Sequence, residues 1–346
     1  MGDDENEPKI PNPNFKFREI ITKNNCCTGI NDIFDIYTLR QNNETYLASP
    51  DKTEYNLNII EIKTNKLFLT LKSHNYFINM VKYFYNELNN DEYLISIEKS
   101  NIILIWEIKE NKYAQIYRID GQISKGYISG FLFIFNNINK TDIIFSYNCK
   151  ECTNIYSLDK KTKIKLIEST NKYDTNYIII WPKNFHLIEL SNKNIYIYDI
   201  ENNELYASFN LGIFDKSKFN CGFVYQYKKN DYLIVCASNG NIIMYNLDEK
   251  NLFRVINIYN NINIQNNIQY VSYIIKWSKK YLIVFEYHNK GYHVIDIETF
   301  KIITKIRNTE AIGSIICAKK FNHHIYGYSL LIANQKNEIS LWTVSN

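Results

Sequence analysis

The sequence contains no apolar run long enough to place it in a membrane. Its longest apolar stretches, at 130–135 and 177–181, stop far short of the ~20 residues that span a bilayer. The sequence also lacks a Gly-x-Ser-x-Gly nucleophile motif and the phosphate-binding loops Gly-x-x-x-x-Gly-Lys and Gly-x-Gly-x-x-Gly. These absences predict a chain that does not cross a membrane and does not belong to those classes of enzyme.

Cysteine usage indicates neither a disulfide scaffold nor a metal centre. The chain has 7 cysteines, an odd number, and Cys26 and Cys27 are adjacent, which does not fit the paired disulfides of a small secreted domain. Cys149 and Cys152 have the spacing of a zinc knuckle, but a structural zinc ion needs two further ligands, and no second pair of this spacing is present. We therefore predict no metal and no cofactor.

The charge of the chain suggests no nucleic-acid partner. The formal net charge is +4 over 346 residues, far from the concentrated basicity of a dedicated nucleic-acid-binding domain. The first residues are acidic and polar, unlike a positively charged and apolar leader. We expect an intracellular protein, cytoplasmic with the nucleus as the alternative, that binds neither specific nucleic acid nor membrane.

The sequence does contain an internal repeat. Seven times, a strand-like apolar segment ends in an aromatic or aliphatic residue followed by a polar one. The pairs are Ile60-Glu61, Trp106-Glu107, Tyr156-Ser157, Tyr198-Asp199, Tyr245-Asn246, Ile295-Asp296 and Trp342-Thr343. Successive pairs are 46, 50, 42, 47, 50 and 47 residues apart. A period in the forties with strand-like patterning is typical of propeller blades of four strands each.

The second repeat shows the unit most clearly. Apolar segments of strand length at 78–84, 92–97, 102–107 and 113–117 are separated by short polar turns. The inner segments are apolar on both faces, as expected of a sheet sandwiched between two neighbours. Aromatic residues make up 15% of the chain, which also favours strands. We therefore predict an all-β fold, a seven-bladed β-propeller with four-stranded antiparallel blades.

The pattern at 69–74, 232–246 and 330–342 resembles that of the WD-repeat β-propeller family, and the resemblance covers about residues 14–346. It is strong in spacing and weak in signature residues, because a Trp-Asp dipeptide is absent and only His74 occupies the family's Gly-His position. The family's usual Asp, six residues before each terminal aromatic, is replaced by Glu54, Ser100, Lys150, Asn192, Asn239, Asn289 and Lys336. The resemblance implies a divergent member in which the family's buried polar network is complete in no blade.

The two ends of the sequence predict how the ring closes. Only residues 343–346 follow Trp342, too few for an outer strand, whereas segment 15–21 is strand-like and precedes the first repeat. Pairing this segment with the last blade would close the ring and cover an exposed sheet edge. We predict a flexible acidic and proline-containing tail at 1–13 and one propeller domain at 14–346. Its blades are predicted at 27–71, 72–119, 120–168, 169–211, 212–258, 259–307 and 308–344 plus 15–21.

The candidate binding residues lie in the turns and loops. The turns between the second and third strands carry a basic residue in five of the seven repeats, and the loops that join blades carry tyrosines. The predicted partner-binding residues are Lys99, Lys150, Lys193, Lys290 and Lys336 in the turns and Tyr76, Tyr127, Tyr173 and Tyr259 in the loops. In a closed ring the lysines surround one mouth and attract an acidic partner. In the alternative interpretation they are solvated turn residues.

These observations predict a non-catalytic scaffold or adaptor for protein–protein interaction. The resemblance implies a monomeric propeller within a larger intracellular hetero-complex, with other proteins or peptides as partners. One alternative is a protein that reads acidic or modified peptides through a basic and aromatic pocket at the mouth. An enzyme with its site at the channel mouth is the third hypothesis, because a fold does not fix a function. The sequence identifies no catalytic residue for it.

Overall fold

The computed structural model describes residues 17–21, 34–51, 54–86, 89–100, 102–120, 128–136, 140–147, 152–157, 162–168, 175–181, 183, 186–191, 194–202, 204–210, 219–237, 240–258, 271–286, 292–306, 315–323, 327–334 and 339–343. These residues form 28 β-strands, which are arranged in four-stranded sheets. The prediction of an all-β fold with four-stranded antiparallel blades is confirmed. The chain divides into two compact units, Met1–Gly121 with Ser272–Asn346 (unit 1) and Gln122–Val271 (unit 2).

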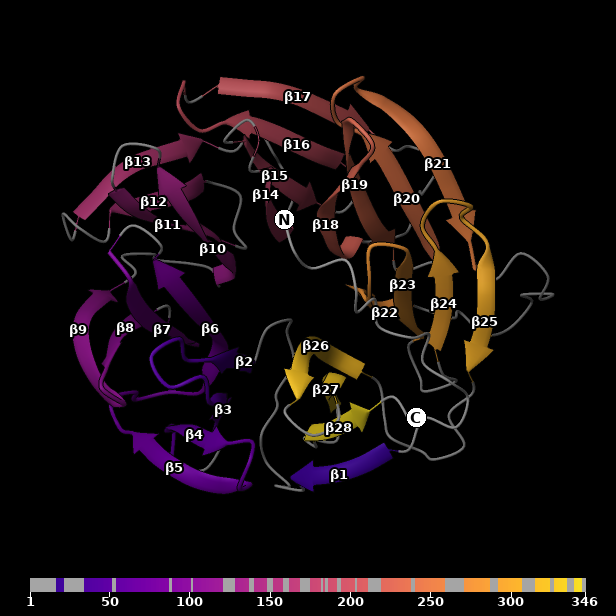
Figure 1. Cartoon of the computed structure of the whole chain (residues 1–346). Coiled ribbons are helices and arrows are strands. Elements are labelled where there is room, and N and C mark those ends of the chain that lie inside the picture. Colours follow the sequence, from indigo (N-terminus) through magenta and orange to yellow (C-terminus); the bar gives the residue numbers. More distant parts are fainter. Residues whose placement is uncertain are drawn as a thin grey trace. The chain divides into compact units, whose positions relative to one another are not determined.

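Unit 1 contains four sheets, whose strands are labelled in Figure 1. Two of them follow the order of the sequence: β2 (Asp35–Thr38), β3 (Thr45–Pro50), β4 (Leu57–Glu61) and β5 (Lys66–Leu71), then β6 (Ile78–Asn86), β7 (Asp91–Glu98), β8 (Ile102–Lys109) and β9 (Lys112–Asp120). A third consists of β22 (Val271–Lys276), β23 (Tyr281–Glu286), β24 (Tyr292–Asp296) and β25 (Ile302–Ile306). The fourth has the order β1 (Phe17–Ile21), β28 (Ile339–Thr343), β27 (Gly327–Asn334) and β26 (Ile315–His323).

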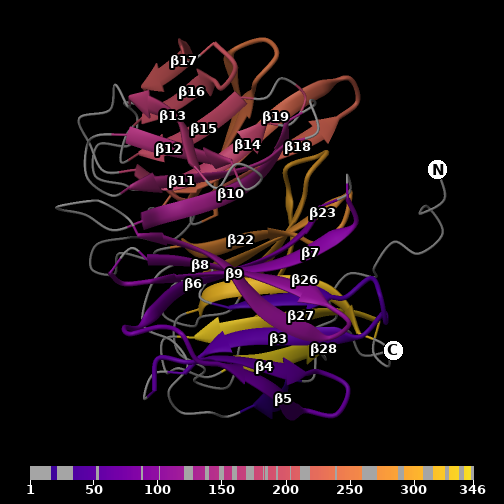
Figure 2. The same cartoon turned by 90° about the vertical axis from the view of Figure 1, so that its left-hand side faces the viewer.

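Unit 2 contains three sheets, each with its strands in sequence order, as Figure 2 shows for β14 to β17. They are β10 (Ile128–Asn136), β11 (Lys140–Tyr147), β12 (Cys152–Ser157) and β13 (Thr162–Glu168); β14 (Thr175–Trp181), β15 (His186–Ser191), β16 (Asn194–Asp199) and β17 (Glu204–Asn210); and β18 (Phe219–Tyr227), β19 (Asn230–Ala237), β20 (Asn241–Asn246) and β21 (Asn251–Asn257). Consecutive hairpins therefore build every sheet of this unit.

The predicted number of blades is wrong. The sequence repeat predicts seven blades, whereas the structure is a six-bladed propeller. The described strands nevertheless form seven four-stranded sheets, so a count of sheets does not give the count of blades. The reason is that the spacing of strand ends reflects hydrogen bonding within each sheet. The number of blades depends instead on how sheets pack against one another around an axis, which the repeat does not encode.

Where the structure describes burial, the second and third strands are mostly buried and the fourth strands are mostly exposed or half-buried. All six residues of β15 and of β20 are buried, whereas β17 is exposed or half-buried throughout. Neighbouring sheets bury this apolar surface together. In unit 1, one core cluster joins Leu57 and Ile59 of β4 to Leu94 of β7 and Trp106 of β8. Strands such as β15 and β20, which are buried on both faces, thus form the interior of the packed sheets.

Three of the turns between third and fourth strands show why a polar residue follows the end of the third strand. The side-chain oxygens of Asp199, Asn246 and Asp296 each accept backbone N–H groups from the residues two and three positions further along the chain. A residue in the left-handed region then leads into the fourth strand, for example Asn65 with φ 55° and Asn111 with φ 62°. Asn and Asp stabilise such turns through these side-chain bonds, so the repeated polar residue shapes a hairpin.

The N-terminal strand pairs with the last strand of the sequence. β1 runs antiparallel to β28, with Phe17 opposite Trp342, Arg18 opposite Leu341 and Ile21 opposite Ile339. Figure 1 shows β1 along the edge of this sheet. The predicted pairing of segment 15–21 with the last sheet is therefore present, and it covers one edge of β28.

Cys221 and Cys236 are free, buried and opposite each other on β18 and β19. The predicted tail at 1–13 lies outside the described residues, and the predicted boundaries of the domain and its blades stay predictions. Across the described part of the chain, no helix has the length and apolarity that crossing a bilayer requires.

Candidate interaction site

Two of the nine predicted partner-binding residues fall in the described part of the chain. Tyr76 lies in the loop that joins β5 to β6, and Lys99 lies in the turn between β7 and β8. Both side chains are exposed, and Tyr76 is 56% exposed. The other seven lie outside the described residues: Lys150, Lys193, Lys290, Lys336, Tyr127, Tyr173 and Tyr259. For these seven residues, binding of a partner stays a prediction from the sequence.

The structure brings the loop of Tyr76 and the turn of Lys99 together at one end of the β6–β9 sheet. The backbone N–H of Lys99 donates a hydrogen bond to the carbonyl oxygen of Phe77, with a distance of 2.8 Å. Phe77, the neighbour of Tyr76, is itself 38% exposed. The turn that carries an exposed lysine is thus bonded to the loop that carries two exposed aromatic side chains.

A third aromatic residue joins them from the neighbouring sheet. Tyr55, in the turn between β3 and β4, packs edge-on against Phe77, with ring centroids 4.9 Å apart and planes at 88°. Tyr55 has φ 57°, which is rare for a bulky residue and is kept only where the surroundings enforce it. We call Tyr55, Tyr76, Phe77 and Lys99 the Tyr76 patch. It spans the ends of two sheets of unit 1.

A buried network fixes the loop that carries the patch. His74 Nδ1 lies 3.1 Å from Glu98 Oε2, and the backbone N–H of Asn75 donates to the same oxygen at 3.1 Å. The Ser100 hydroxyl donates to the other carboxylate oxygen of Glu98. Glu98 is 1% exposed, and a buried carboxylate is tolerated when several donors satisfy it. These bonds tie residues 74 and 75 to the end of β7, directly beside Tyr76.

The network continues inward to Ser96 and Trp106. His74 Nε2 lies 2.6 Å from Ser96 Oγ, and Trp106 Nε1 donates to the same oxygen at 3.0 Å. We call His74, Ser96, Glu98 and Trp106 the His74 network. The prediction that no blade holds a complete buried polar network is therefore wrong for the β6–β9 sheet. Glu98 supplies the carboxylate from eight residues before Trp106, where the family pattern directs attention to position 100.

Burial controls the protonation of this network. Desolvation lowers the pKa of His74, although the hydrogen bond and charge of Glu98 act in the opposite direction. At neutral pH the imidazole is therefore uncharged. The consistent arrangement of protons has Nδ1–H donating to Glu98 and Nε2 accepting from the Ser96 hydroxyl.

The residue types Ser, His and Glu also occur in nucleophilic triads, so a catalytic interpretation of the His74 network has to be weighed. Ser96 is 0% exposed, and its oxygen already accepts a hydrogen bond from Trp106. A substrate carbonyl cannot reach that oxygen without displacing the core around it. We interpret the His74 network as a structural element that positions the Tyr76 patch.

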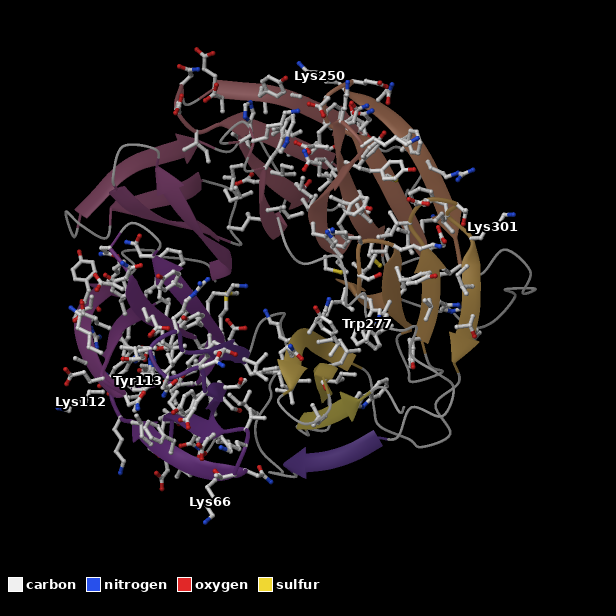
Figure 3. The ribbon with its side chains drawn as sticks, viewed as in Figure 1. Lys66, Lys112, Tyr113, Lys250, Trp277 and Lys301 are labelled. Atoms are coloured by element: carbon white, nitrogen blue, oxygen red, sulfur yellow. The ribbon has the colours of Figure 1, made fainter. Side chains whose placement is uncertain are left out.

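The remaining exposed hydrophobic residues follow the repeat. Eleven large hydrophobic side chains in the described residues are exposed, and nine of these lie on fourth strands: Leu67, Phe68, Leu205, Tyr206, Leu252, Phe253, Val255, Ile302 and Ile303. Lysines stand next to several of them, and Figure 3 shows Lys66, Lys112 and Lys301 pointing away from the fourth strands of unit 1. Because exposed apolar residues recur on the fourth strands of four sheets, we attribute them to the fold and not to a binding site. Tyr76 and Phe77 are the two exceptions, and this is why we choose their loop as the candidate interaction site.

Groups that could hold a metal are absent from the part of the chain that the structure describes: no cluster of three or more His, Cys, Asp or Glu side chains occurs there. Cys149 lies outside these residues. The strand-end residues Asp199 and Asp296 serve as turn acceptors. The sequence interpretation missed Tyr55, Phe77 and Glu98, of which Phe77 carried a usable signal as the neighbour of Tyr76.

Comparison with solved structures supports the fold. BBS1N in complex with ARL6DN matches with a TM-score of 0.68 and 10% identity, over 93% of this chain and 94% of that chain. The β-propeller domain of Cps50 (Swd1) from Myceliophteria thermophila matches with a TM-score of 0.67 and 12% identity, over 95% and 100% of the two chains. Raptor from Chaetomium thermophilum has a TM-score of 0.66 and 12% identity, over 96% of this chain but 29% of that chain.

No protein-family model and no curated protein sequence matches the chain. In all, 1347 solved chains match its fold. At identities of 10% to 12%, likeness in structure reports the fold and does not transfer a function. The comparisons therefore place the chain among β-propellers and select no single activity.

Proposed function

We propose that the protein is an interaction platform of the WD-repeat type, without chemistry of its own, that binds partner proteins through the Tyr76 patch. The single observation that carries this proposal is the loop of Tyr76 and Phe77, which exposes two large aromatic side chains and is pinned to a buried network. Aromatic anchors on a rigid support bind with little loss of conformational entropy. The neighbouring Lys99 adds a positive charge that suits an acidic residue of the partner.

The solved propellers that resemble this chain agree with such a role. One of them was crystallised in complex with another protein, as BBS1N with ARL6DN. The likeness is one of fold, so it supports binding of proteins in general and names no partner for this chain. We further propose that the protein acts inside the cell, in the cytoplasm or nucleus, as one subunit of a larger complex.

The experiment that tests the proposal compares two triple variants of the full chain. Tyr76→Ala, Phe77→Ala and Lys99→Glu together remove the Tyr76 patch. Lys301→Glu, Ile302→Ala and Ile303→Ala make a matched change at the start of the fourth strand β25, where Lys301 directly precedes the strand and Ile302 and Ile303 are 40% and 47% exposed. Each variant is used with the unchanged protein for affinity purification from native extract, followed by mass spectrometry. Melting curves of all three proteins control for folding.

The expected result is a stoichiometric set of partners that binds the unchanged protein and the β25 variant and is lost from the Tyr76 patch variant. Partners that remain on the patch variant would refute docking at this site. Partners that are absent from all three proteins would refute the platform function itself.

The alternative, a protein that reads acidic or modified peptides at the mouth, rests on the turn lysines. Lys99 is the member of that set which the structure describes, and its backbone is bonded to that of Phe77, whose side chain is exposed. Lys99→Glu alone distinguishes the two functions. Loss of all partners in this single variant favours the peptide pocket, whereas partial loss favours docking on the aromatic residues.

A further inference from the structure

Two buried cysteine residues face each other in the β18–β21 sheet of unit 2, whose strands are labelled in Figure 1. Cys221 on β18 stands directly opposite Cys236 on β19 in their antiparallel ladder. Both thiols are free, and the two residues are 2% and 0% exposed. Directly opposite residues of such a ladder place their side chains on the same face of the sheet, so the two thiol groups are neighbours.

The spacing of the ladder suits a bond between the two sulfur atoms. Directly opposite residues of an antiparallel pair have Cα atoms about 4.5 to 5.5 Å apart. Disulfides join residues whose Cα atoms are about 4.4 to 6.8 Å apart. The backbone of β18 and β19 therefore already has a spacing at which Cys221 and Cys236 can be linked.

Burial keeps the pair in the thiol form. It raises the pKa of Cys236, and the neighbouring Cys221 raises this pKa further. Because the thiolate is the form that reacts with oxidants, the folded protein slows oxidation of the pair. A single buried cysteine of this kind serves as a small apolar residue, whereas two cysteines that stand opposite each other can also be joined.

The pair stands near an end of the β18–β19 ladder. Cys221 is the third residue of β18, and Cys236 is the residue before the last of β19. Phe219 and Ala237 form the next pair toward this end, and a shift of register separates them from the two cysteines. A bulge disrupts a ladder locally, and the ends of elements open at a lower free-energy cost than the core. Local opening therefore gives a small molecule access to the thiols while the rest of the sheet stays folded.

We propose that Cys221 and Cys236 form a modification site, which a peroxide oxidises to a cross-strand disulfide. The thiolate of one cysteine attacks hydrogen peroxide, whose O–O bond breaks, and gives a sulfenic acid and one molecule of water. The thiol of the other cysteine then attacks the sulfenic sulfur, the S–S bond forms, and a second molecule of water leaves. Two thiols are oxidised and one peroxide is reduced to two molecules of water. We call this pair the Cys221–Cys236 site.

The disulfide acts on the end of the ladder at which it forms. It links β18 to β19 beside the shift of register, so it hinders the local opening that exposes the thiols. Backbone amides near this end should therefore exchange their hydrogen atoms more slowly after oxidation. The Cys221–Cys236 site thus converts contact with a peroxide into a change in the local stability of one sheet.

The Cys221–Cys236 site goes beyond the binding function and is independent of the Tyr76 patch. The site belongs to unit 2 and the patch to unit 1. The variants that test the two proposals share no residue. Failure of one proposal therefore leaves the other unaffected.

Mass spectrometry of the full chain tests the proposal. The reduced and folded protein is treated with hydrogen peroxide, remaining thiols are blocked with an alkylating reagent, and the protein is digested without reduction. We expect a pair of linked peptides that contains Cys221 and Cys236, lighter by two hydrogen atoms than the separate thiol peptides. Dithiothreitol should return both residues to thiols. Hydrogen exchange of the oxidised and reduced proteins measures the effect on β18 and β19.

Three variants separate the steps of the reaction. In Cys236→Ser no second thiol is present, so the sulfenic acid of Cys221 should persist and react with dimedone, which traps this group. Cys221→Ser should give the dimedone product at Cys236. Cys317→Ser is the matched control, because it removes a cysteine of β26 in unit 1 and should leave the linked peptides unchanged.

Several results would overturn the proposal. A disulfide that forms only in urea would show that the folded sheet does not permit the reaction. Links from Cys221 or Cys236 to other cysteines, in place of the expected link, would refute the pairing. Equal dimedone labelling of the unchanged protein and the single variants would show that the second cysteine does not react with the first. Unchanged hydrogen exchange after oxidation would refute the effect on the ladder.

Discussion

The indole nitrogen of Trp106 lies 3.0 Å from the hydroxyl oxygen of Ser96, and this bond joins β8 to β7 in the interior of their sheet. The same oxygen contacts His74 Nε2 at 2.6 Å, so one hydroxyl group connects a core tryptophan with the loop that presents Tyr76. A loop is usually the most mobile part of a sheet protein. Here its conformation depends on side chains with almost no solvent exposure.

The first prediction concerns this shared hydroxyl. Ser96→Ala leaves the Trp106 N–H and the His74 ring nitrogen without their partner in a buried position, which costs about 1–3 kcal/mol in the free energy of unfolding. Urea denaturation followed by fluorescence measures the change. Trp106→Phe and the double variant complete a cycle, in which we expect a non-additive result because the two residues share one bond. Additive effects would contradict the network.

The second prediction is a dependence of stability on pH that His74 causes. Burial lowers the pKa of His74 in the folded protein below its ordinary value of 6.5. Just below pH 6.5 the imidazole is therefore protonated to a greater extent in the unfolded chain than in the folded protein. The contribution of neutral His74 to the free energy of unfolding is therefore fully present above pH 6.5. It is lost as the pH falls from that value toward the lower pKa of the folded protein. The slope has an upper limit of about 1.4 kcal/mol per pH unit.

Urea midpoints at several pH values between 5 and 8 check this prediction. In His74→Gln, which cannot titrate, the curve should be flatter over the same interval. A variant whose curve parallels that of the unchanged protein would assign the pH dependence to other groups.

The third prediction concerns β1. Deletion of residues 1–22 removes the strand Phe17–Ile21 and exposes the edge of β28, so we expect lower solubility and a lower melting temperature. Deletion of residues 1–13 keeps β1 and provides the control, which should melt like the full chain. Equal melting temperatures for the two deletions would show that the pairing contributes no stability.

The strands could be predicted closely from the sequence. The segments expected at 78–84, 92–97, 102–107 and 113–117 correspond to β6, β7, β8 and β9. Alternating turns and runs that are apolar on both faces encode such strands locally, and this is why the prediction succeeded. The number of blades depends on packing between sheets, for which the sequence offers no local signal.

The candidate site was predictable in part, for identifiable reasons. Tyr76 and Lys99 follow from the rule that loops and turns carry binding residues. The contact of Tyr55 with Phe77 depends on a left-handed backbone at a tyrosine, which residue preferences do not indicate. Glu98 was overlooked because the family pattern points to Ser100. Strand geometry offers the better guide, since positions 96 and 98 share one face of the strand.

The pairing of β1 with β28 makes the two far ends of the sequence neighbours. Phe17 and Trp342 lie opposite each other, although a loop of roughly 300 residues separates them, and closing such a loop has an entropic cost that only the assembled protein can offset. A donor fluorophore placed ahead of residue 17 and an acceptor placed after residue 343 would therefore come close only when this sheet is complete. Energy transfer between the two fluorophores would thus report in real time whether β1 is paired with β28, without a change to the Tyr76 patch.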